Sequence, residues 1–183
     1  MEWSGELTDQ LDWHWVNHLR PRLDGLADAE YFWEPVPGCW SVRPRALATA
    51  PELAGSGEFV VERAWPAPEP APVTTIAWRL AHLIIVFGQR AASHFGGPPT
   101  DQETLPYSGT AAGALGQLDA AYAAWIGGVR GLDDAGLELP CGPSEGPYAK
   151  APMGALVLHI NREAIHHGAE IALLRDLYAH QPG

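Results

Sequence analysis

The sequence predicts an all-α protein, a bundle of four helices, and three observations lead to that prediction. Four segments repeat apolar residues at the three- and four-residue spacing of a helix that is buried along one side. A residue that can cap a helix or occupy its first turn stands at the start of each segment. The stretches between the segments are rich in glycine and proline, which interrupt helices. The helices are therefore expected to end at these stretches.

The composition fits one globular domain that spans residues 1–183. Hydrophobic residues make up 46% of the chain and charged residues 18%, a balance that supports a sizeable core at this length. Eleven basic and twenty-two acidic residues give a formal net charge of −11, which disfavours binding to nucleic acid. No apolar run approaches the ~20 residues of a membrane span, and the first residues lack the features of a signal peptide. We therefore expect a cytoplasmic protein with no membrane partner.

The first helix is expected to begin at Thr8 or Asp9 and to run to about Leu23. One face of this helix is predicted to carry Leu11, Trp15, His18 and Leu19. His14 and His18 are four residues apart, a spacing that can hold a metal ion. We favour a surface or packing role for both histidines, with His18 able to border a pocket.

A long crossover, residues 34–73, follows the first helix and is too long for a simple connection within a bundle. Trp33, Trp40 and Trp65 indicate that the crossover is ordered and packs on the helices. A short hairpin is predicted near residues 57–61. Because long ordered loops often shape binding sites, Trp40 is a candidate pocket residue.

The second and third helices have clear start signals. The second is expected to begin with a threonine cap in residues 73–75. Its residues 76–87 are apolar on nearly all sides, so it should be the most buried helix. The third helix is expected to start near Ser108 or Thr110 and to run through Val129. Small residues along the third helix permit close packing.

The last helix, roughly residues 151–178, carries the residues with the strongest chemical signal. Its buried stripe is predicted to hold Met153, Val157, Ile160, Ala164, Ile171, Leu174 and Tyr178. His167 falls within roughly 20° of the centre of the stripe, and Glu163 lies one turn earlier at its flank. His166 is rotated about 100° away and should point elsewhere. Since a buried, unpaired carboxylate costs several kcal/mol, Glu163 needs a metal, an ion pair or a shifted pKa.

Two interpretations of this pair remain open at this point. In one, Glu163 pairs with an arginine such as Arg79 or Arg90, and His167 is a hydrogen-bonded core histidine. In the other, a divalent metal satisfies both side chains and needs a third ligand from another helix. His82, in the middle of the apolar second helix, is the candidate for that third ligand.

Short motifs spread along the chain point to a known family. They are Pro37-Gly38-Cys39-Trp40-Ser41-Val42-Arg43, Ile76-Ala77-Trp78-Arg79-Leu80-Ala81-His82, and Glu163-x-x-x-His167 followed by Leu173-Leu174-Arg175. In this order and spacing they resemble the DinB/YfiT superfamily over nearly the whole chain. The resemblance implies a four-helix bundle of up-down-down-up topology, with a long crossover between helices 1 and 2.

The resemblance also implies a set of metal ligands. Many members of the superfamily hold a divalent metal with one histidine from the second helix and two from the last helix. Here His82 takes the first role and His167 the last, while Glu163 stands where the remaining histidine is expected. This His/Glu/His set resembles the mycothiol-dependent maleylpyruvate isomerase branch, in which such a set holds zinc. Zn is therefore the first choice of metal, and a carboxylate ligand also suits Ni, Mn or Fe.

Neighbouring polar and aromatic residues are candidates for a supporting role. Glu170, a further turn along the last helix, could orient a ligand histidine. Arg79 could neutralise a substrate carboxylate, with an ion-pair role as the alternative. Trp40, His18 and His166 could border the pocket, and for His166 we favour a solvent-facing position. The two cysteines, Cys39 and Cys141, are expected to be free thiols.

The function implied by the resemblance is that of a metal-dependent enzyme with a small-molecule substrate. It would be a thiol-dependent transferase or isomerase that uses a metal-activated thiol or water, with a low-molecular-weight thiol as a second cofactor. Hydrolysis is the nearest chemical variant. The alternative from another class is a non-catalytic, stress-associated bundle that binds a metal or a ligand. No catalytic residue is assigned from the sequence, and a homodimer is expected only as the commonest assembly of such bundles.

Overall fold

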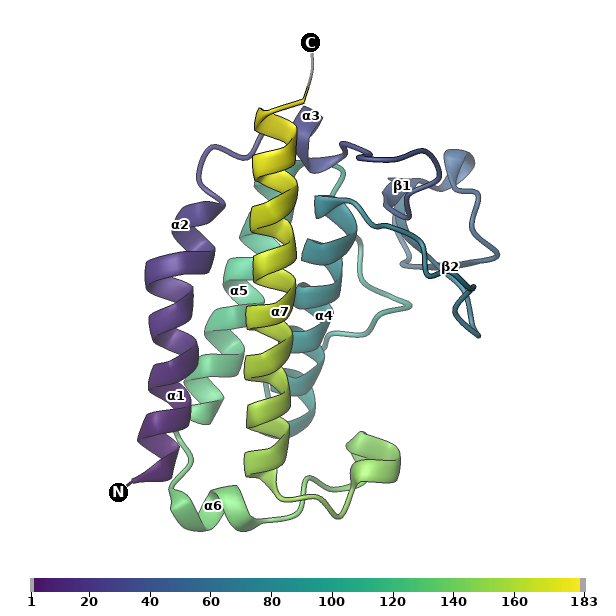
Figure 1. The fold of residues 1–183 in the computed structure, drawn as a ribbon. Helices are drawn as coiled ribbons and strands as arrows, with labels where there is room; N and C mark the ends of the chain where they lie inside the picture. Colours follow the sequence, from purple (N-terminus) through teal and green to yellow (C-terminus); the bar gives the residue numbers. More distant parts are fainter. Residues whose placement is uncertain (1, 182–183) are drawn as a thin grey trace.

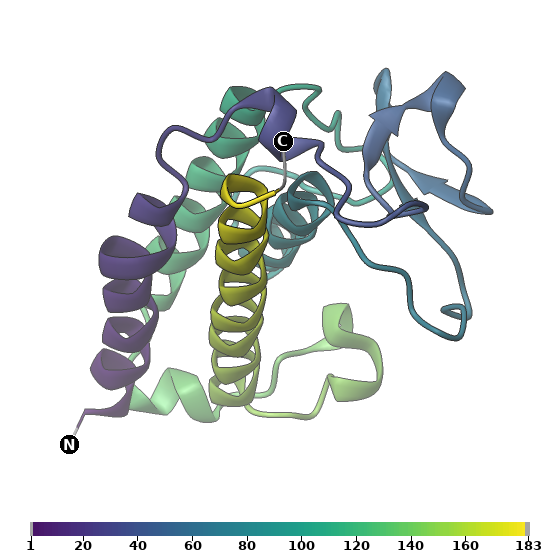
Figure 2. The ribbon, with the colours of Figure 1, turned by 45° about the horizontal axis from the view of Figure 1, so that its top comes forward.

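The computed structural model describes residues 2–181 and is mostly helical (Figure 1). Its long helices are α1 Trp3–His14, α4 Ile76–Phe95, α5 Ala111–Val129 and α7 Met153–Ala179. They lie side by side along one direction in both ribbon views (Figures 1 and 2). No helix among the described residues has the length and apolar character that a membrane span requires.

Shorter elements connect the long helices. A π-helical turn η1 (Trp15–Leu19) and α2 (Arg20–Arg22) continue α1, and α3 (Asp28–Tyr31) follows. The crossover contains β1 (Val42–Pro44), the 3₁₀ turn η2 (Arg45–Leu47), β2 (Glu52–Ala54) and β3 (Phe59–Arg63). Between α5 and α7 lie α6 (Asp134–Glu138) and the 3₁₀ segment η3 (Pro143–Tyr148).

The first helix begins earlier than the sequence predicts, at Trp3 rather than at Thr8 or Asp9. The residue before it, Glu2, makes no capping hydrogen bond with its side chain. The backbone N–H of Ser4 instead donates to the carboxylate of Asp134 on α6, at 2.9 Å. Because this cap comes from a residue 130 positions away, no local pattern could reveal it.

The π-helical turn η1 changes which residues of the first helix are buried. Pro21 has no N–H to donate to the carbonyl four residues earlier, and its ring crowds that turn. The wider turn directly before it bonds the N–H of Arg20 to the carbonyl of Trp15. Trp15 and Leu19 stay buried, whereas His18 is exposed. His18 therefore has a surface position and does not share one face with Leu11, Trp15 and Leu19, because the helix is not regular as that prediction assumed.

The crossover carries a small antiparallel sheet, so the all-α prediction is wrong in this respect. The strand order is β1-β3-β2, and both outer strands pair with Val61 of β3, through Val42 and through Ala54. The hairpin predicted near residues 57–61 corresponds to β2 and β3. Its turn passes through Gly55 at φ 112°, where a Cβ atom would lie 2.7 Å from the Tyr107 ring. Glycine is therefore required at this turn.

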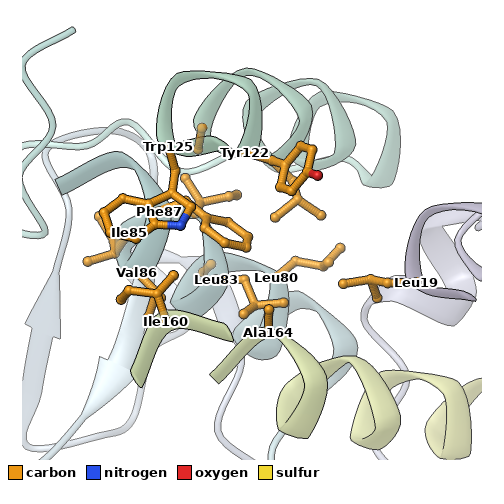
Figure 3. Packing of buried hydrophobic residues seen from close by; sticks show 14 of the residues in the cluster. Leu19, Leu80, Leu83, Ile85, Val86, Phe87, Tyr122, Trp125, Ile160 and Ala164 are labelled. Atoms are coloured by element: carbon orange, nitrogen blue, oxygen red, sulfur yellow. The ribbon is translucent and has the colours of Figure 1, made fainter. Parts of the chain in front are cut away.

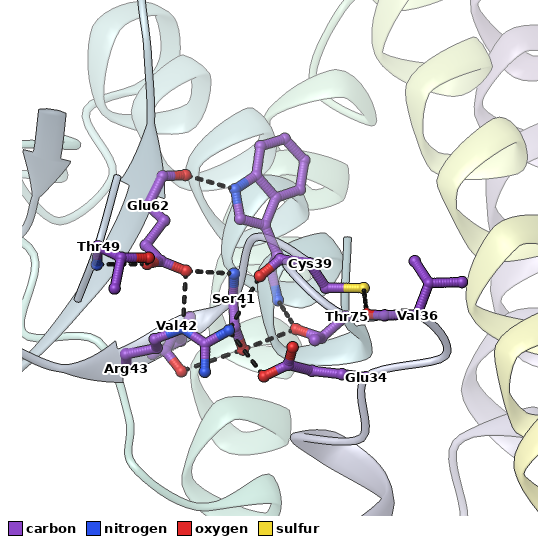
Figure 4. Close-up of polar contacts among 10 residues, drawn as sticks. Glu34, Val36, Cys39, Ser41, Val42, Arg43, Thr49, Glu62 and Thr75 are labelled. Carbon is purple, nitrogen blue, oxygen red and sulfur yellow. Dashed lines mark hydrogen bonds and ion pairs between the residues drawn. The ribbon is translucent and has the colours of Figure 1, made fainter. Parts of the chain in front are cut away.

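A buried carboxylate holds the crossover together (Figure 4). Glu62 on β3 is 1% exposed, and its Oε2 accepts hydrogen bonds from Ser41 N–H at 3.1 Å and Arg43 Nε at 2.8 Å. Its Oε1 accepts from the N–H of Thr49 at 2.8 Å. The backbone carbonyl of the same residue accepts from Trp78 Nε1 on α4, also at 2.8 Å. The sheet is thereby tied to the helix that supplies His82.

The predicted starts of the second and third helices are confirmed. Thr75 caps α4 by accepting a hydrogen bond from the N–H of Trp78, and Thr110 caps α5 by accepting from that of Gly113. The crossover also helps to position α4, because Thr75 N–H donates to the carbonyl of Trp40. Trp40 thus contributes to the start of α4 through its backbone.

Aromatic and aliphatic side chains together fill the centre of the bundle (Figure 3). The rings of Trp15 and Tyr122 are stacked at 3.8 Å between centroids, and Phe87 meets both edge-on. Trp125 of α5 is fully buried. In the α7 stripe, Met153, Val157, Ile160, Ala164, Ile171 and Leu174 are buried as predicted, while Tyr178 is only partly buried.

Candidate metal centre

Three candidate ligands meet between two helices that are adjacent in Figure 1. His82 comes from the middle of α4, and Glu163 and His167 come from successive turns of α7. One donor atom from each of the three lies within 4.8 Å of the others. The four-residue spacing puts the two α7 side chains on one face, and the packing of α7 against α4 supplies the third.

The spacing of the donor atoms matches a metal site better than a set of hydrogen bonds. Oε2 of Glu163 lies 3.4 Å from His82 Nε2 and 3.2 Å from His167 Nε2. Charge-assisted hydrogen bonds are usually about 2.7–2.9 Å long. Two ligand atoms that each lie about 2.1 Å from a tetrahedral ion are separated by about 3.4 Å. Two imidazoles and a carboxylate also form a donor set that divalent transition metals accept.

A carboxylate orients His167, the buried histidine of the candidate site. His167 is 8% exposed, and its Nδ1 lies 2.6 Å from Oε2 of Glu170. Arg79 Nη1 is 3.3 Å from the same nitrogen, and Arg79 Nε is 3.1 Å from Glu170 Oε2. The shorter contact assigns the Nδ1 proton to the bond with Glu170, because arginine offers only donors. Nε2 of His167 then keeps a lone pair directed toward Glu163 and His82.

His82, a candidate ligand, is held in its neutral form. Burial first of all, and then the nearby His167, lower the pKa of His82 to about 4, although Glu163 opposes the change. Its ring stacks on that of Trp78, with 5.6 Å between centroids and 9° between planes. Sequence reasoning overlooked Trp78 as a site residue. Its position one turn before His82 on the same helix was the signal that could have found it.

Glu163 is ionised without the arginine partners that the sequence offered. Burial alone would raise the pKa of Glu163, but its contact with His82 and the nearby His159 and His167 lower it. Arg79 pairs with Glu170, and Arg90 pairs with Glu145. Neither Arg79 nor Arg90, the two arginines named from the sequence, therefore pairs with Glu163. Arg162 is the arginine near it, with Nε 4.0 Å from Oε1 of Glu163.

The remaining candidates occupy different places. His166 is exposed and lies 3.4 Å from Oε1 of Glu170. With His167 and Glu170 it forms a second group of donor atoms within 4.8 Å. In this second group, His167 faces Glu170 through Nδ1, and we have assigned the proton on that nitrogen to the hydrogen bond with Glu170. A protonated nitrogen has no lone pair for a metal ion. We therefore favour the group that contains His82.

Two predicted pocket residues lie outside this cluster. His18 stacks on His14, with 5.9 Å between ring centroids, and both border a groove between α1 and α7. Trp40 is partly buried and lies where the crossover meets the start of α4. The aromatic ring that stacks on His82 is that of Trp78, one turn earlier on α4.

The fold and the cluster define a class of protein, a helical bundle with a His/Glu/His site between two of its long helices. The sequence model of the DinB superfamily matches residues 10–171, and the chain therefore belongs to the DinB superfamily. No curated protein and no solved structure shows a significant match to the chain.

Proposed function

We propose that the chain is a metal-dependent member of the DinB superfamily, in which His82, Glu163 and His167 bind a divalent cation. Zn²⁺ is the first choice, and Ni, Mn and Fe are the alternatives. One observation carries this proposal, the position of a single carboxylate oxygen at 3.4 and 3.2 Å from two imidazole Nε2 atoms. The neutral state of His82 supports it, since only an unprotonated imidazole can bind a metal.

We further propose that the site is catalytic and acts on a small molecule. Held by His82, Glu163 and His167, a divalent cation would supply activation of a thiol or water by making that group more acidic. Glu170 keeps the proton on His167 Nδ1, and Trp78 covers one face of the His82 ring. A thiol-dependent transferase or isomerase with a low-molecular-weight thiol fits these features. The His/Glu/His pattern of the maleylpyruvate isomerase branch supports the same choice.

We also infer the up-down-down-up topology and one domain over residues 1–183, of which residues 1, 182 and 183 lie outside the described part. The course of the chain supports the topology, because α1 begins at the end of the bundle opposite to the end at which α7 finishes (Figure 1). A hydrophobic cluster with members from all four long helices supports the single domain.

Metal content tests the first proposal directly. We expect tag-free protein, purified without added metal, to contain near-stoichiometric metal by elemental analysis. His82→Ala should lose that metal, because two ligands remain. His166→Ala is the matched control and should keep it, since its side chain is exposed and its loss leaves all three ligands. Folded wild-type protein that takes up no added Zn, Ni or Mn would contradict the proposal.

Turnover tests the second proposal. Metal-loaded protein is mixed with a panel of small thiols and electrophilic substrates, and product formation is followed with and without each thiol. We expect thiol-dependent turnover that Glu163→Gln abolishes. Stoichiometric metal without turnover on any member of the panel would instead favour the non-catalytic, metal-binding alternative.

A further inference from the structure

A pocket of about 360 Å³ lies along the same pair of helices as the candidate metal centre. Arg90 of α4, His159 and Arg162 of α7, and Glu145 of η3 line its polar side. Tyr148, Ala155 and Leu156 are among the residues of its apolar side. Its volume falls at the lower end of the range of about 300–1,000 Å³ that small-molecule sites occupy.

The guanidinium of Arg90 has unused donors in this pocket. Within residues 2–181 it contacts Oε1 of Gln89 at 3.4 Å and Oε2 of Glu145 at 3.5 Å. Both contacts are long beside the 2.7–2.9 Å typical of charge-assisted hydrogen bonds. Its Nε is buried and has no hydrogen-bond partner among the described residues. The other oxygen of Glu145 is bonded to His94 at 2.9 Å, so this carboxylate is shared between two basic groups.

The pocket gathers positive charge in an acidic protein. Arg90 and Arg162 line the pocket together with one carboxylate, that of Glu145, although the whole chain has a formal net charge of −11. Nε of Arg162 also lies 4.0 Å from Oε1 of Glu163, at the wall next to the candidate metal centre. A partly buried guanidinium with free donors is well suited to an anion that can accept two parallel N–H bonds. A carboxylate is such an anion, and the apolar lining of the pocket suits the carbon body of an organic acid.

One wall of the pocket touches the candidate metal centre. Nδ1 of His159 lies 3.6 Å from Oε1 of Glu163, the oxygen on the far side of the carboxylate from the two ligand histidines. The same nitrogen accepts a hydrogen bond from Arg162 Nη2 at 2.6 Å. A molecule held in the pocket would therefore lie next to the group that we propose as a ligand.

We propose that this pocket binds the carboxylate of a small organic acid, with Arg90 as its principal anion-binding residue. The proposal names the substrate class of the metal-dependent enzyme, and in that respect it rests on the function proposed above. Binding of the acid itself needs no metal, which allows the two proposals to be tested separately.

Calorimetric titration with benzoate tests the pocket, and benzamide serves as the uncharged probe of the same shape. We expect saturable binding of benzoate to the wild-type protein and much weaker binding of benzamide. Arg90→Gln should raise the dissociation constant for benzoate about tenfold or more, because charged hydrogen bonds are lost. Arg130→Gln is the matched control, since Arg130 also pairs with a carboxylate, that of Asp12, but lies outside the pocket. Arg90→Lys keeps the charge, so its dissociation constant for benzoate should lie between those of wild type and Arg90→Gln.

A cysteine gives a second readout that needs no substitution. Cys141 lines the pocket, whereas Cys39 lies in the crossover, and both are buried free thiols. We expect benzoate to slow the alkylation of Cys141 by iodoacetamide several-fold and to leave that of Cys39 unchanged, as measured by peptide mass spectrometry. Benzamide should protect neither thiol.

The outcomes separate this inference from the metal proposal. Arg90-dependent binding of benzoate to chelator-treated protein would support the pocket even if no metal binds to the chain. Benzoate binding that is lost in His82→Ala or after chelation, and is unchanged in Arg90→Gln, would place the anion on the metal and overturn the inference. Equal binding of benzoate and benzamide would overturn it as well, as would the absence of saturable binding up to roughly tens of millimolar.

Discussion

The proton on His167 decides which nitrogen of this residue can bind a metal. A neutral imidazole carries one N–H, so a firm acceptor at Nδ1 leaves the lone pair on Nε2. Glu170 is that acceptor, at 2.6 Å, and Nε of Arg79 lies 3.1 Å from the same carboxylate oxygen. At the scale of single residues, the candidate site therefore depends on a carboxylate that we do not place among the ligands.

Glu170→Gln is expected to weaken metal binding about 10- to 100-fold, because it removes the charge that holds the Nδ1 proton. The measurement is a competition between the protein and a metallochromic chelator. Glu138→Gln, an exposed substitution on α6, is the control and should leave the affinity unchanged. Equal affinities for Glu170→Gln and wild type would show that Glu170 does not orient His167.

At the scale of elements, the crossover is held to α4 by one buried carboxylate. Burial alone would raise the pKa of Glu62, but hydrogen bonds from Thr49 and Ser41 and the charge of Arg43 outweigh it and lower the pKa. Trp78 connects the backbone of this residue to the His82 ring. Loss of the carboxylate should therefore loosen the sheet and, through Trp78, one side of the candidate site.

Glu62→Gln is expected to lower the free energy of unfolding by about 3 kcal/mol, the cost of breaking a buried, hydrogen-bonded ion pair. Urea denaturation at neutral pH measures the change. Glu58→Gln, exposed beside the same strand, is the control and should stay within about 0.5 kcal/mol of wild type. An equally small effect at position 62 would mean that Arg43 and the backbone donors find other partners.

The stability difference between wild type and Glu62→Gln should depend on pH in a defined direction. Because the pKa of Glu62 is lower in the folded state than its ordinary value of 4.5, its stabilising effect is fully present above that value. It is lost as the pH falls through the lower, folded-state pKa. We expect the stability difference between wild type and Glu62→Gln to be constant from neutral pH down to about pH 5 and to shrink below pH 4. A difference that grows on acidification would give the wrong sign.

At the scale of the whole molecule, the aromatic core and the candidate site share α4 but use other elements as partners. Phe87 of α4 meets Trp15 of η1 and Tyr122 of α5, whereas His82 of α4 meets Glu163 and His167 of α7. Stability and metal binding should therefore respond to different substitutions. The homodimer stays a prediction at this scale.

Phe87→Ala should reduce the free energy of unfolding by about 3–5 kcal/mol, because it removes a fully buried ring and leaves a cavity. Metal stoichiometry should be kept as long as the variant is folded. Chemical denaturation and elemental analysis on the same preparations check both statements. Trp13→Ala, at a tryptophan that is 62% exposed, is the control for loss of an aromatic side chain and should change stability little.

Features that depend on nearby residues could be predicted from the sequence. The caps at Thr75 and Thr110 act over three residues, and the buried stripe of α7 repeats within each turn. The same periodicity put Glu163 and His167 on one face. These predictions were accurate because hydrogen bonds within a helix and the burial of one of its faces both have a short, regular period.

Features that depend on distant partners could not be predicted in this way. Asp134 caps the first helix although it lies 130 positions further along the chain. The π-helical turn before Pro21 shifts the helix out of the regular 3.6-residue period that the prediction assumed. The sheet in the crossover formed around Glu62, whose partners lie 13 to 21 residues earlier. A helical wheel contains none of this information.

The sequence by itself therefore determined that this chain forms a helical bundle of the DinB type and which side chains α7 turns inward. Tertiary structure alone decided how their charges are balanced. In the folded chain, Arg79 pairs with Glu170 and Arg90 pairs with Glu145. Oε2 of Glu163 lies between the imidazoles of His82 and His167. The physical reason is that a helix sets the direction of a side chain through local geometry, whereas the partner of a charge is chosen by the packing of helices that are far apart in the chain.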